Sequence, residues 1–443
     1  MEALQVAMEP TPKTYWLETY GCQMNFAESN SLELDLLHHG YLPAQFPEEA
    51  SVVIINTCSV RTTAENRIRG RLGYFKSMKR SRKVTVVLTG CMAQRLIDQE
   101  LQEQGVDVII GTNGKQHVVS LLAGENSQDL VTYEFSRTHH KPGDLRAFVP
   151  IMNGCNNFCS YCIVPYVRGR EISRSPQEIF DEISFLDDTG VKEITLLGQN
   201  VNSYAYRRGD ASLGFTDLLD GIARRVSSVQ WIRFLSSHPK DISPAIGELM
   251  LEHRSICRHI HIPIQHGSNS VLKRMNRKYT REHFLGILAS LREQVPGITF
   301  SSDILIGFPG ETEQDVELTL SAMREARFND AFTYYFNPRE GTEAAGYSGQ
   351  LDDDTKLSRL KCIIAEQKAI SLLEKQRRIG TIELVLVEDR AKKQHDEKLA
   401  RTEHDDMVVI ASSAALEIGA MVPVRLNSLS GNTLKGELAS CGK

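Results

Sequence analysis

The stretch Arg146-Ala-Phe-Val-Pro-Ile-Met-Asn-Gly-Cys155-Asn-Asn-Phe-Cys159-Ser-Tyr-Cys162 joins an apolar, strand-like run to a loop with three cysteines. Three thiolates on one short loop can hold three corners of an iron–sulfur cube. Without a fourth cysteine in the loop, one iron would stay open to an exogenous ligand. Structural zinc prefers four ligands in paired spacing, so zinc or a purely structural role for the thiols is the less favoured alternative.

Strand-like runs continue after this loop at regular intervals. Six of them are β-branched or apolar, at Ala147–Met152, Glu193–Leu197, Trp231–Leu235, His259–Ile264, Thr299–Ile306 and Ala331–Tyr335. Helical patterns separate them, as in Pro176–Asp187, Arg281–Val295 and Glu313–Ala326. Regular β–α repetition of this length predicts a full or partial (β/α) barrel.

The first part of the chain also alternates strands and helices. Strand-like runs occupy Thr14–Leu17, Ser51–Ile55, Val84–Leu88 and Val106–Ile110, and amphipathic stretches cover Ala27–His38 and Ala64–Met78. Such alternation predicts a doubly wound parallel α/β domain, with helices covering the sheet.

Three further cysteines each follow one of these strands, namely Cys22, Cys58 and Cys91. All strands of a parallel sheet end at the same edge, where ligands collect. Because each gap between these cysteines is about one β–α unit long, we expect the three thiols to converge on one site. The alternative, three unrelated buried thiols, is the better interpretation for any single one of them.

A third, small domain is predicted at the C-terminus. A long helical pattern, Leu351–Ile379, ends at a compositional break near Gly380. The remaining residues contain β-type runs and no convincing helix, which predicts a small all-β barrel. The polar segment Gly124–Gly143 is expected to be a linker. We therefore predict an α/β multidomain chain with boundaries at 13–128, 141–372 and 374–439.

Composition limits the class of protein. The 443 residues are 41% hydrophobic and 24% charged, with a net charge of −5, as in ordinary globular proteins. No apolar run approaches the ~20 residues that span a bilayer, and residues 1–13 lack the features of a secretory or mitochondrial leader. Sequence alone therefore predicts a cytoplasmic protein without a membrane anchor.

Two basic islands nevertheless favour a polyanionic partner. Arg61–Lys83 holds nine basic residues and one acid, and Val271–Arg281 holds five basic residues and no acid. Clustered charge on an acidic chain suits nucleic acid bound to one face. Solvated helix faces are the equally weighted alternative.

The cysteine loop at residues 155–162 resembles the signature of radical S-adenosylmethionine (SAM) enzymes, with Tyr161 in the aromatic position before the third cysteine. In that superfamily the open iron chelates the amino and carboxylate groups of SAM, and one-electron reduction releases a 5′-deoxyadenosyl radical. The resemblance implies that Cys155, Cys159 and Cys162 hold this cluster and that Tyr161 packs near the adenine.

The chain is also similar from end to end to the methylthiotransferase family, and most closely to its MiaB type. The segments that carry the resemblance begin at Tyr20, Tyr161, Leu197 and Gly307 and read YGCQMN, YCIVPYVRGREISR, LGQNVNSY and GFPGETE. It implies an N-terminal methylthiotransferase domain, a radical SAM core and a C-terminal TRAM barrel that binds RNA. It further implies that Cys22, Cys58 and Cys91 bind an auxiliary 4Fe–4S cluster, again with one open iron.

Other site residues follow from this resemblance and from position. Beyond the iron, SAM is expected to contact Tyr161, Gly198, Gln199, Asn200, Gln265, Ser268 and Asp303. An ordinary strand-to-helix turn is an equal alternative at residues 198–200. The expected RNA contacts are Arg61, Arg67, Arg69, Arg71, Lys273, Arg274, Arg277, Lys278, Lys392, Lys393 and Arg401. The C-terminal segment from Glu374 has eleven basic and eleven acidic residues, so we expect the barrel to share RNA binding with both islands.

The implied reaction adds a methylthio group to C2 of N6-isopentenyladenosine beside the tRNA anticodon. One SAM methylates a sulfur at the auxiliary cluster, and a second SAM gives the radical; no protein side chain is expected to be catalytic. The same chemistry on threonylcarbamoyl-adenosine in tRNA, or on an aspartate of a ribosomal protein, is the first alternative. A non-catalytic iron–sulfur RNA sensor is the second. An electron donor such as flavodoxin or ferredoxin and a monomeric state are also expected.

Overall fold

The chain folds into two units, each described by itself. A computed structural model describes residues 13–59, 62–95, 104–124, 133–138, 140–141, 143–209, 211–390, 397–411 and 416–439. The first unit comprises the chain up to His140 together with Tyr166–Gly169, and the second comprises Lys141–Pro165 together with the chain from Arg170 onward. Parts of the expected linker, Gly124–Gly143, lie outside the described residues.

The first unit is built on a parallel sheet with strand order β2-β1-β3-β4-β5. Its strands are β1 (Thr14–Thr19), β2 (Leu42–Pro43), β3 (Val52–Thr57), β4 (Thr85–Gly90) and β5 (Val108–Ile110). Its helices are α1 (Gln23–His38), α2 (Thr62–Met78), α3 (Cys91–Arg95) and α5 (Val118–Leu122), with short 3₁₀ turns η1 (Pro47–Glu49) and η2 (Thr112–His117). The predicted parallel α/β domain is confirmed.

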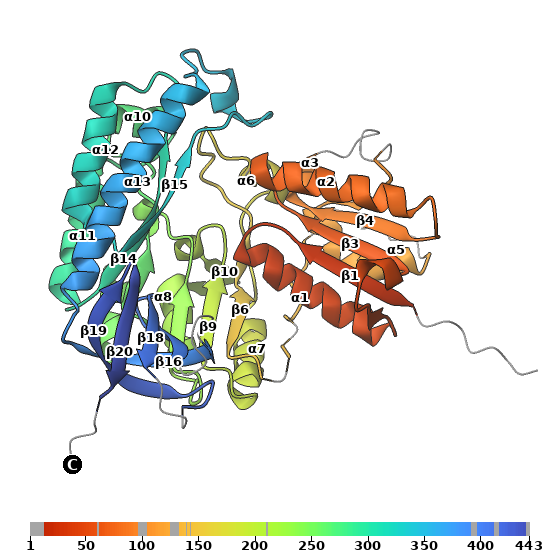
Figure 1. Cartoon of the computed structure of the whole chain (residues 1–443), viewed down its shortest axis with the longest axis horizontal. Coiled ribbons are helices and arrows are strands. Elements are labelled where there is room, and N and C mark those ends of the chain that lie inside the picture. The colour runs from red at the N-terminus through yellow and green to blue at the C-terminus, as the bar shows by residue number, and fades with distance from the viewer. Residues whose placement is uncertain are drawn as a thin grey trace, which may run out of the picture. The chain divides into compact units, whose positions relative to one another are not determined.

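Alternation along β3 explains why helices cover both faces of this sheet (Figure 1). Successive side chains of a strand point to opposite faces, and all six residues of β3 are buried. Val53 and Ile55 pack with Ile68, Leu72 and Phe75 of α2. Val52 and Ile54 pack on the other face with Leu32 and Leu36 of α1. The continuous apolar run therefore predicts a central, doubly covered strand.

The second unit begins with six parallel strands in two sheets, β12-β9-β6 and β13-β14-β15. The strands are β6 (Arg146–Pro150), β9 (Glu193–Leu197), β12 (Trp231–Phe234), β13 (His259–His261), β14 (Thr299–Ile306) and β15 (Asp330–Tyr335). All six predicted strands are present. Within the described residues the two sheets do not close into a ring, so the barrel is partial.

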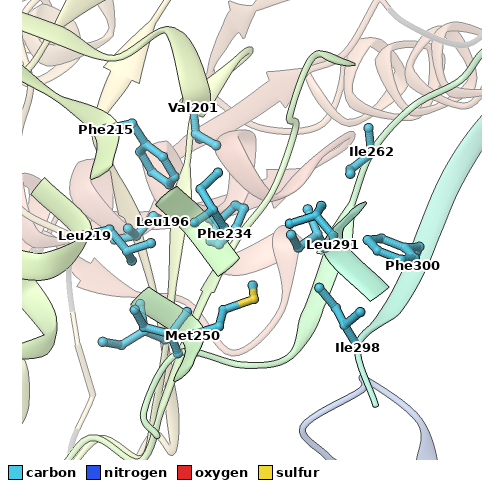
Figure 2. Close-up of a cluster of buried hydrophobic side chains, with 14 of the residues drawn as sticks. Leu196, Val201, Phe215, Leu219, Phe234, Met250, Ile262, Leu291, Ile298 and Phe300 are labelled. Atoms are coloured by element: carbon cyan, nitrogen blue, oxygen red, sulfur yellow. The ribbon is translucent and has the colours of Figure 1, made fainter. Parts of the chain in front are cut away.

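Helices surround these strands and complete the apolar core. They are α7 (Pro176–Asp188), α8 (Phe215–Ala223), α9 (Ala245–Glu252), α10 (Asn269–Arg274), α11 (Arg281–Gln294), α12 (Glu313–Ala326) and α13 (Asp353–Gln376). Helix α6 (Val164–Arg168) follows the cysteine loop, and its residues 166–168 belong to the first unit. Figure 2 shows side chains of this core, among them Leu196, Phe234 and Phe300. Small elements complete this part: β7 (Met152–Asn153), β8 (Ile172–Ser173), β10 (Ala205–Arg208), β11 (Ala211–Gly214), η3 (Val201–Ser203), η4 (Pro239–Asp241) and η5 (Glu343–Gly346).

A closed five-stranded barrel of order β16-β17-β18-β20-β19 ends the chain. Its strands are β16 (Ile382–Arg390), β17 (Glu397–Thr402), β18 (Met407–Ala411), β19 (Met421–Ser430) and β20 (Thr433–Leu438). This confirms the small all-β barrel. The β-type runs of the sequence, Ile382–Val387, Met407–Ile410 and Met421–Leu426, correspond to β16, β18 and β19, whereas β17 and β20 were not predicted.

The turn between β17 and β18 fixes this barrel to the core of the second unit. Arg233 of β12 donates to the backbone carbonyls of Thr402 at 2.9 Å and Glu403 at 2.7 Å. The Asn329 amide donates to the Asp406 carboxylate at 2.8 Å, and Lys375 of α13 pairs with the same carboxylate at 3.1 Å. Buried charge-assisted contacts of this kind hold the barrel in one orientation on the core.

Candidate iron–sulfur and SAM sites

Strand register places two of the N-terminal cysteines side by side. Thr57 at the end of β3 pairs with Gly90 at the end of β4, and Cys58 and Cys91 directly follow these strand ends. Gly90 has a φ of +96°, and a Cβ built on it would lie 2.4 Å from the carbonyl oxygen of Thr57. Only glycine allows this backbone conformation and this approach. Cys58 and Cys91 are buried there, each 4% exposed.

The third cysteine of the first unit reaches the same edge through the loop that follows β1. Gly21, with φ +122°, lies so close to Cys58 that an added Cβ would be 2.6 Å from the Cβ of that cysteine. The Asn25 amide donates to the Thr57 carbonyl at 2.8 Å, and so ties the start of α1 to the end of β3. Cys22, the residue before α1, is exposed. The carboxyl edge of the sheet therefore holds all three thiols.

A buried ionic cluster in the first unit was missed by sequence reasoning. Arg168 donates to the Glu28 carboxylate at 2.7 Å and to the Asn25 side-chain oxygen at 3.0 Å. Lys115 pairs with the same carboxylate. Arg168 and Glu28 are 140 positions apart in the sequence, so neither helical nor strand periodicity connects them.

In the second unit, Cys155, Cys159 and Cys162 lie on the loop between β7 and α6. The backbone N–H of Cys162 donates to the Cys159 carbonyl at 2.9 Å, which closes a tight turn. Phe158 has a left-handed φ of +46°, a strained conformation for a bulky residue. The Asn157 amide donates to the Cys155 sulfur at 3.5 Å. The backbone is thus folded to present the three side chains.

The segment that follows α10 forms hydrogen bonds to this loop. Arg277 donates to the Cys159 sulfur at 3.3 Å, and the Asn276 amide donates to the Phe158 carbonyl at 2.8 Å. The backbone N–H of Ser160 donates to the Met275 carbonyl at 3.1 Å. The sequence assigned Arg277 to RNA, whereas its guanidinium contacts a cysteine of the loop.

Burial keeps the thiols of Cys155 and Cys162 protonated when no metal is bound. It raises the pKa of Cys155, and it raises the pKa of Cys162 to about 12, with the neighbouring Cys159 adding to the effect. Burial also raises the pKa of the Tyr161 phenol, whose ring packs against an apolar cluster that includes Met275. Metal binding must therefore displace protons from these thiols.

The donor set fits iron–sulfur cubes better than single ions. Among the described residues, the one group of three metal-ligating atoms within 4.8 Å of one another is Asp220, Glu252 and His253, which contains no cysteine. Neither cysteine trio is drawn together that tightly. Three separated thiols match the corners of a 4Fe–4S cube, so the residues present fit such a group at both sites.

The loop after β9 carries three of the residues expected to contact SAM, Gly198, Gln199 and Asn200. The Gln199 side-chain oxygen accepts from the backbone N–H of Gly154 at 2.6 Å, directly before Cys155. The Asn200 amide donates to Asp241 at 2.7 Å and accepts from the backbone of His238 at 3.1 Å. Both side chains therefore fix neighbouring loops. Gly198 packs so closely that a Cβ would be 2.4 Å from the Cγ of Met152.

The other expected SAM contacts lie around β13 and β14. Ser268 donates to Asp315 at 2.5 Å and is 2% exposed. Gln265 has a left-handed φ of +67° and forms a backbone bridge with Ile304. Asp303 lies 3.4 Å from the imidazole of His261. The Ser268 side chain is therefore already engaged within the protein, through a short hydrogen bond to Asp315.

The structure divides the expected RNA contacts into three groups. Arg67, Lys273 and Lys278 are exposed, and Arg69 is partly exposed. Lys278 also donates to the side-chain oxygen of Asn276 at 2.5 Å. A second group is less exposed and forms contacts within the protein: Arg71 with Glu18, Arg274 with the carbonyls of Pro309 and Gly310, and Arg401 with Glu388 and Asp405. Arg61, Lys392 and Lys393 lie outside the described residues.

No helix in the described part of the chain is long and apolar enough to cross a membrane.

Comparison with known families agrees with both units. Residues 149–323 match the radical SAM superfamily, and residues 14–111 match a family described as uncharacterized protein family UPF0004. The solved structure of the radical SAM methyltransferase TsrM from Kitasatospora setae is similar with a TM-score of 0.55 and 16% identity, over 76% of this chain and 77% of that one. At this identity the likeness concerns the fold alone.

Relatives that match over nearly their full length are more informative about the family than this likeness in fold. A tRNA-2-methylthio-N(6)-dimethylallyladenosine synthase of Treponema pallidum is 44% identical over 96% of this chain and 98% of its own length. The synthases of Bacteroides thetaiotaomicron, at 41%, and Syntrophomonas wolfei, at 40%, are similar over 96% and 97% of this chain and over 96% and 98% of their own lengths. These matches run through both cysteine trios and the barrel.

Proposed function

The chain belongs to the tRNA-2-methylthio-N(6)-dimethylallyladenosine synthase family of radical SAM enzymes, and on this premise we propose how its residues divide the work. It is a tRNA methylthiotransferase that acts on C2 of isopentenylated adenosine. The observation that carries the assignment of residues is the pair of cysteine trios, one at a strand edge and one in a clasped loop. Threonylcarbamoyl-adenosine and ribosomal-protein substrates are not favoured, because the relatives are named for the isopentenyl nucleoside.

The reaction explains the need for such sites. The C2–H bond of adenine is unactivated, so an acid–base pair of side chains cannot break it at a useful rate. Two 4Fe–4S clusters and SAM, when bound, supply a carbon radical and a sulfur donor. The protein supplies binding, orientation and exclusion of water.

We assign the thiols by their surroundings. Cys155, Cys159 and Cys162 hold the cluster that binds SAM, and Arg277 orients the Cys159 sulfur by its hydrogen bond. Cys22, Cys58 and Cys91 hold the auxiliary cluster. Each trio leaves one corner of its cube for an exogenous ligand, which suits SAM at one site and a sulfur group at the other.

The remaining residues of the expected SAM site fall into two groups, according to the hydrogen bonds that their side chains form within the protein. Tyr161, Gln265 and Asp303 and the backbone of Gly198 line the SAM site in this proposal. Gln199, Asn200 and Ser268 act as positioning residues, since their side chains already bond to Gly154, Asp241 and Asp315.

The tRNA backbone is bound by the exposed residues Arg67, Lys273 and Lys278 and by the partly exposed Arg69, with Arg61, Lys392 and Lys393 as further candidates. Phosphate contacts of this kind weaken as salt rises. Sequence recognition in an anticodon loop comes instead from splayed bases. We further propose a cytoplasmic monomer that receives electrons from a carrier such as flavodoxin or ferredoxin.

Mass spectrometry of tRNA tests the function. A strain that lacks this gene should lose the methylthio mark and retain the isopentenyl group on the adenosine beside the anticodon. The wild-type gene should restore the mark. Unchanged tRNA in the deletion strain would show that this chain does not catalyse the reaction.

Single cysteine variants test the division between the two trios. Cys159→Ala should abolish formation of 5′-deoxyadenosine from SAM, because it removes a ligand of the SAM-binding cluster. Cys58→Ala should leave part of this SAM cleavage and abolish thiolation of tRNA. Cys257→Ala, in a buried cysteine outside both trios, is the control and should retain both activities. Equal effects of the first two variants would contradict separate roles.

A further inference from the structure

The sheet β13-β14-β15 of the second unit has one face packed against helices and one face that carries polar groups. Phe300 and Ile304 of β14 pack in the apolar core with side chains of α11 and α12. Because successive side chains of a strand point to opposite faces, Ser301, Asp303 and Leu305 lie on the other face. Helices form the outer ring of a (β/α) barrel, so this second face, here called the inner face, lines the interior of the partial barrel.

Phe332 of β15 is an aromatic residue that stays exposed on the inner face. It pairs in register with Asp303 of β14 and is 51% exposed, whereas Phe300 on the helix-covered face is fully buried. The rings of Phe332 and His261 meet in a T-shaped arrangement, with centroids 5.8 Å apart. The Asp303 carboxylate lies 3.4 Å from the His261 imidazole, and its side chain is 27% exposed. An aromatic ring, an imidazole and a carboxylate are therefore grouped at one place on the inner face.

Hydrogen bonds hold the imidazole of this group in place. The Nδ1 of His261 lies 3.0 Å from the Ser301 hydroxyl, and the Nε2 of His259 lies 2.9 Å from the same hydroxyl. The other ring nitrogen of His259 lies 2.8 Å from the Thr299 hydroxyl. The imidazole beside Phe332 is thus fixed before any ligand arrives, which lowers the entropic cost of binding there.

The inner face leads directly to the cysteine loop. Two residues further along each strand, Leu305 of β14 and Tyr334 of β15 belong to one apolar cluster with Tyr161 of that loop. Because alternate residues of a strand share a face, Tyr334 and Phe332 are neighbours on the inner face. The family resemblance assigns Tyr161 to the adenine of SAM, so Phe332 is a second aromatic surface, one step further from the cysteine loop.

We propose that Phe332 is the surface on which the target adenine of the tRNA stacks, with the Asp303 carboxylate at the edge of the bound base. This inference rests on the proposed function, which brings two purines to this part of the chain, the adenine of SAM and the adenine to be modified. Bases that proteins recognise in RNA loops are splayed out and stacked on aromatic side chains. An ionised carboxylate accepts hydrogen bonds, and the isopentenylated N6 of adenine retains one N–H to donate to it.

The affinity for two RNAs tests this inference without relying on activity. One probe is an anticodon stem–loop with N6-isopentenyladenosine at the target position, and the other is the same stem–loop with an abasic site there. Each is titrated against the full chain with its clusters, without SAM or reductant. Base–aromatic stacking contributes roughly 5- to 150-fold to affinity per base. In Phe332→Ala the preference for the first RNA, given by the ratio of the two dissociation constants, should therefore fall by at least about fivefold.

Further variants separate the aromatic ring from a general change of the protein. Phe332→Tyr keeps the ring and should keep the preference. Phe185→Ala in α7 is the matched control, since Phe185 is 50% exposed in the same unit, and it should keep the preference as well. If Phe332→Ala does not fold, Phe332→Leu takes its place, because leucine keeps an apolar side chain without a ring.

Each result decides the inference. An unchanged preference in Phe332→Ala, or in Phe332→Leu where it is used, would overturn it, and so would an equal fall in Phe185→Ala. Isopentenylated tRNA left without a methylthio group by the wild-type holoenzyme would refute the proposed function instead. Normal thiolation by the wild type together with an unchanged preference in the Phe332 variant would refute this inference alone.

Discussion

At the scale of single residues, Arg277 provides a sharp test of the SAM site. Its guanidinium donates to the Cys159 sulfur at 3.3 Å and to the Pro263 carbonyl at 3.0 Å. Groups that hydrogen-bond to metal ligands typically contribute 10- to 100-fold to affinity or activity. Arg277→Met should therefore slow formation of 5′-deoxyadenosine by about 10- to 100-fold, measured with a chemical reductant. Lys361→Met, in an exposed residue of α13 in the same unit, should not; an equal loss in both would contradict the role.

At the scale of elements, the close ends of β3 and β4 determine whether the auxiliary trio can form. Gly90→Ala would place a methyl group 2.4 Å from the Thr57 carbonyl oxygen in a left-handed conformation, at a cost of about 1–3 kcal/mol. The ends of the two strands must then separate. We expect loss of the auxiliary irons, about half of the total, with SAM cleavage retained. Gly70→Ala in α2, where a Cβ meets nothing within 4 Å, should keep all irons. Full iron in Gly90→Ala would contradict this account.

At the scale of the whole molecule, buried histidines make the second unit sensitive to acid. Burial lowers the pKa of His238 to about 2, of His259 to about 3 and of His404 to about 4. Below pH ~6.5 the unfolded chain binds protons that the folded chain does not, so stability falls as pH falls, by about 1.4 kcal/mol per pH unit for each histidine. Denaturant unfolding of the apo protein from pH 7.5 to 5 should show this slope. His238→Gln should reduce it by one proton, and flat stability would contradict the prediction.

Sequence patterns predicted the elements well and the contacts between them poorly. Glu193–Leu197 and Thr299–Ile306 were predicted to the residue, because short runs rich in β-branched and apolar residues between helical patterns are typical of strands. The hairpin of β10 and β11 is mostly exposed and polar, so no apolar pattern marks it. The cysteine clusters were predictable because their spacing is local or follows whole β–α units. Arg168 and Arg277 contact partners 140 and 118 positions away, and a sequence carries no periodic signal over such separations.

The docked turn of the C-terminal barrel has a consequence for how a long substrate is held. Arg233, Asn329 and Lys375 anchor that turn to the core of the second unit. The barrel therefore does not move independently of the core when it binds nucleic acid. An RNA stem bound by the C-terminal barrel would therefore have a fixed orientation relative to the partial (β/α) barrel. Selection among tRNAs would then depend on the distance and angle between the bound stem and the modified nucleoside, in addition to the identity of that nucleoside.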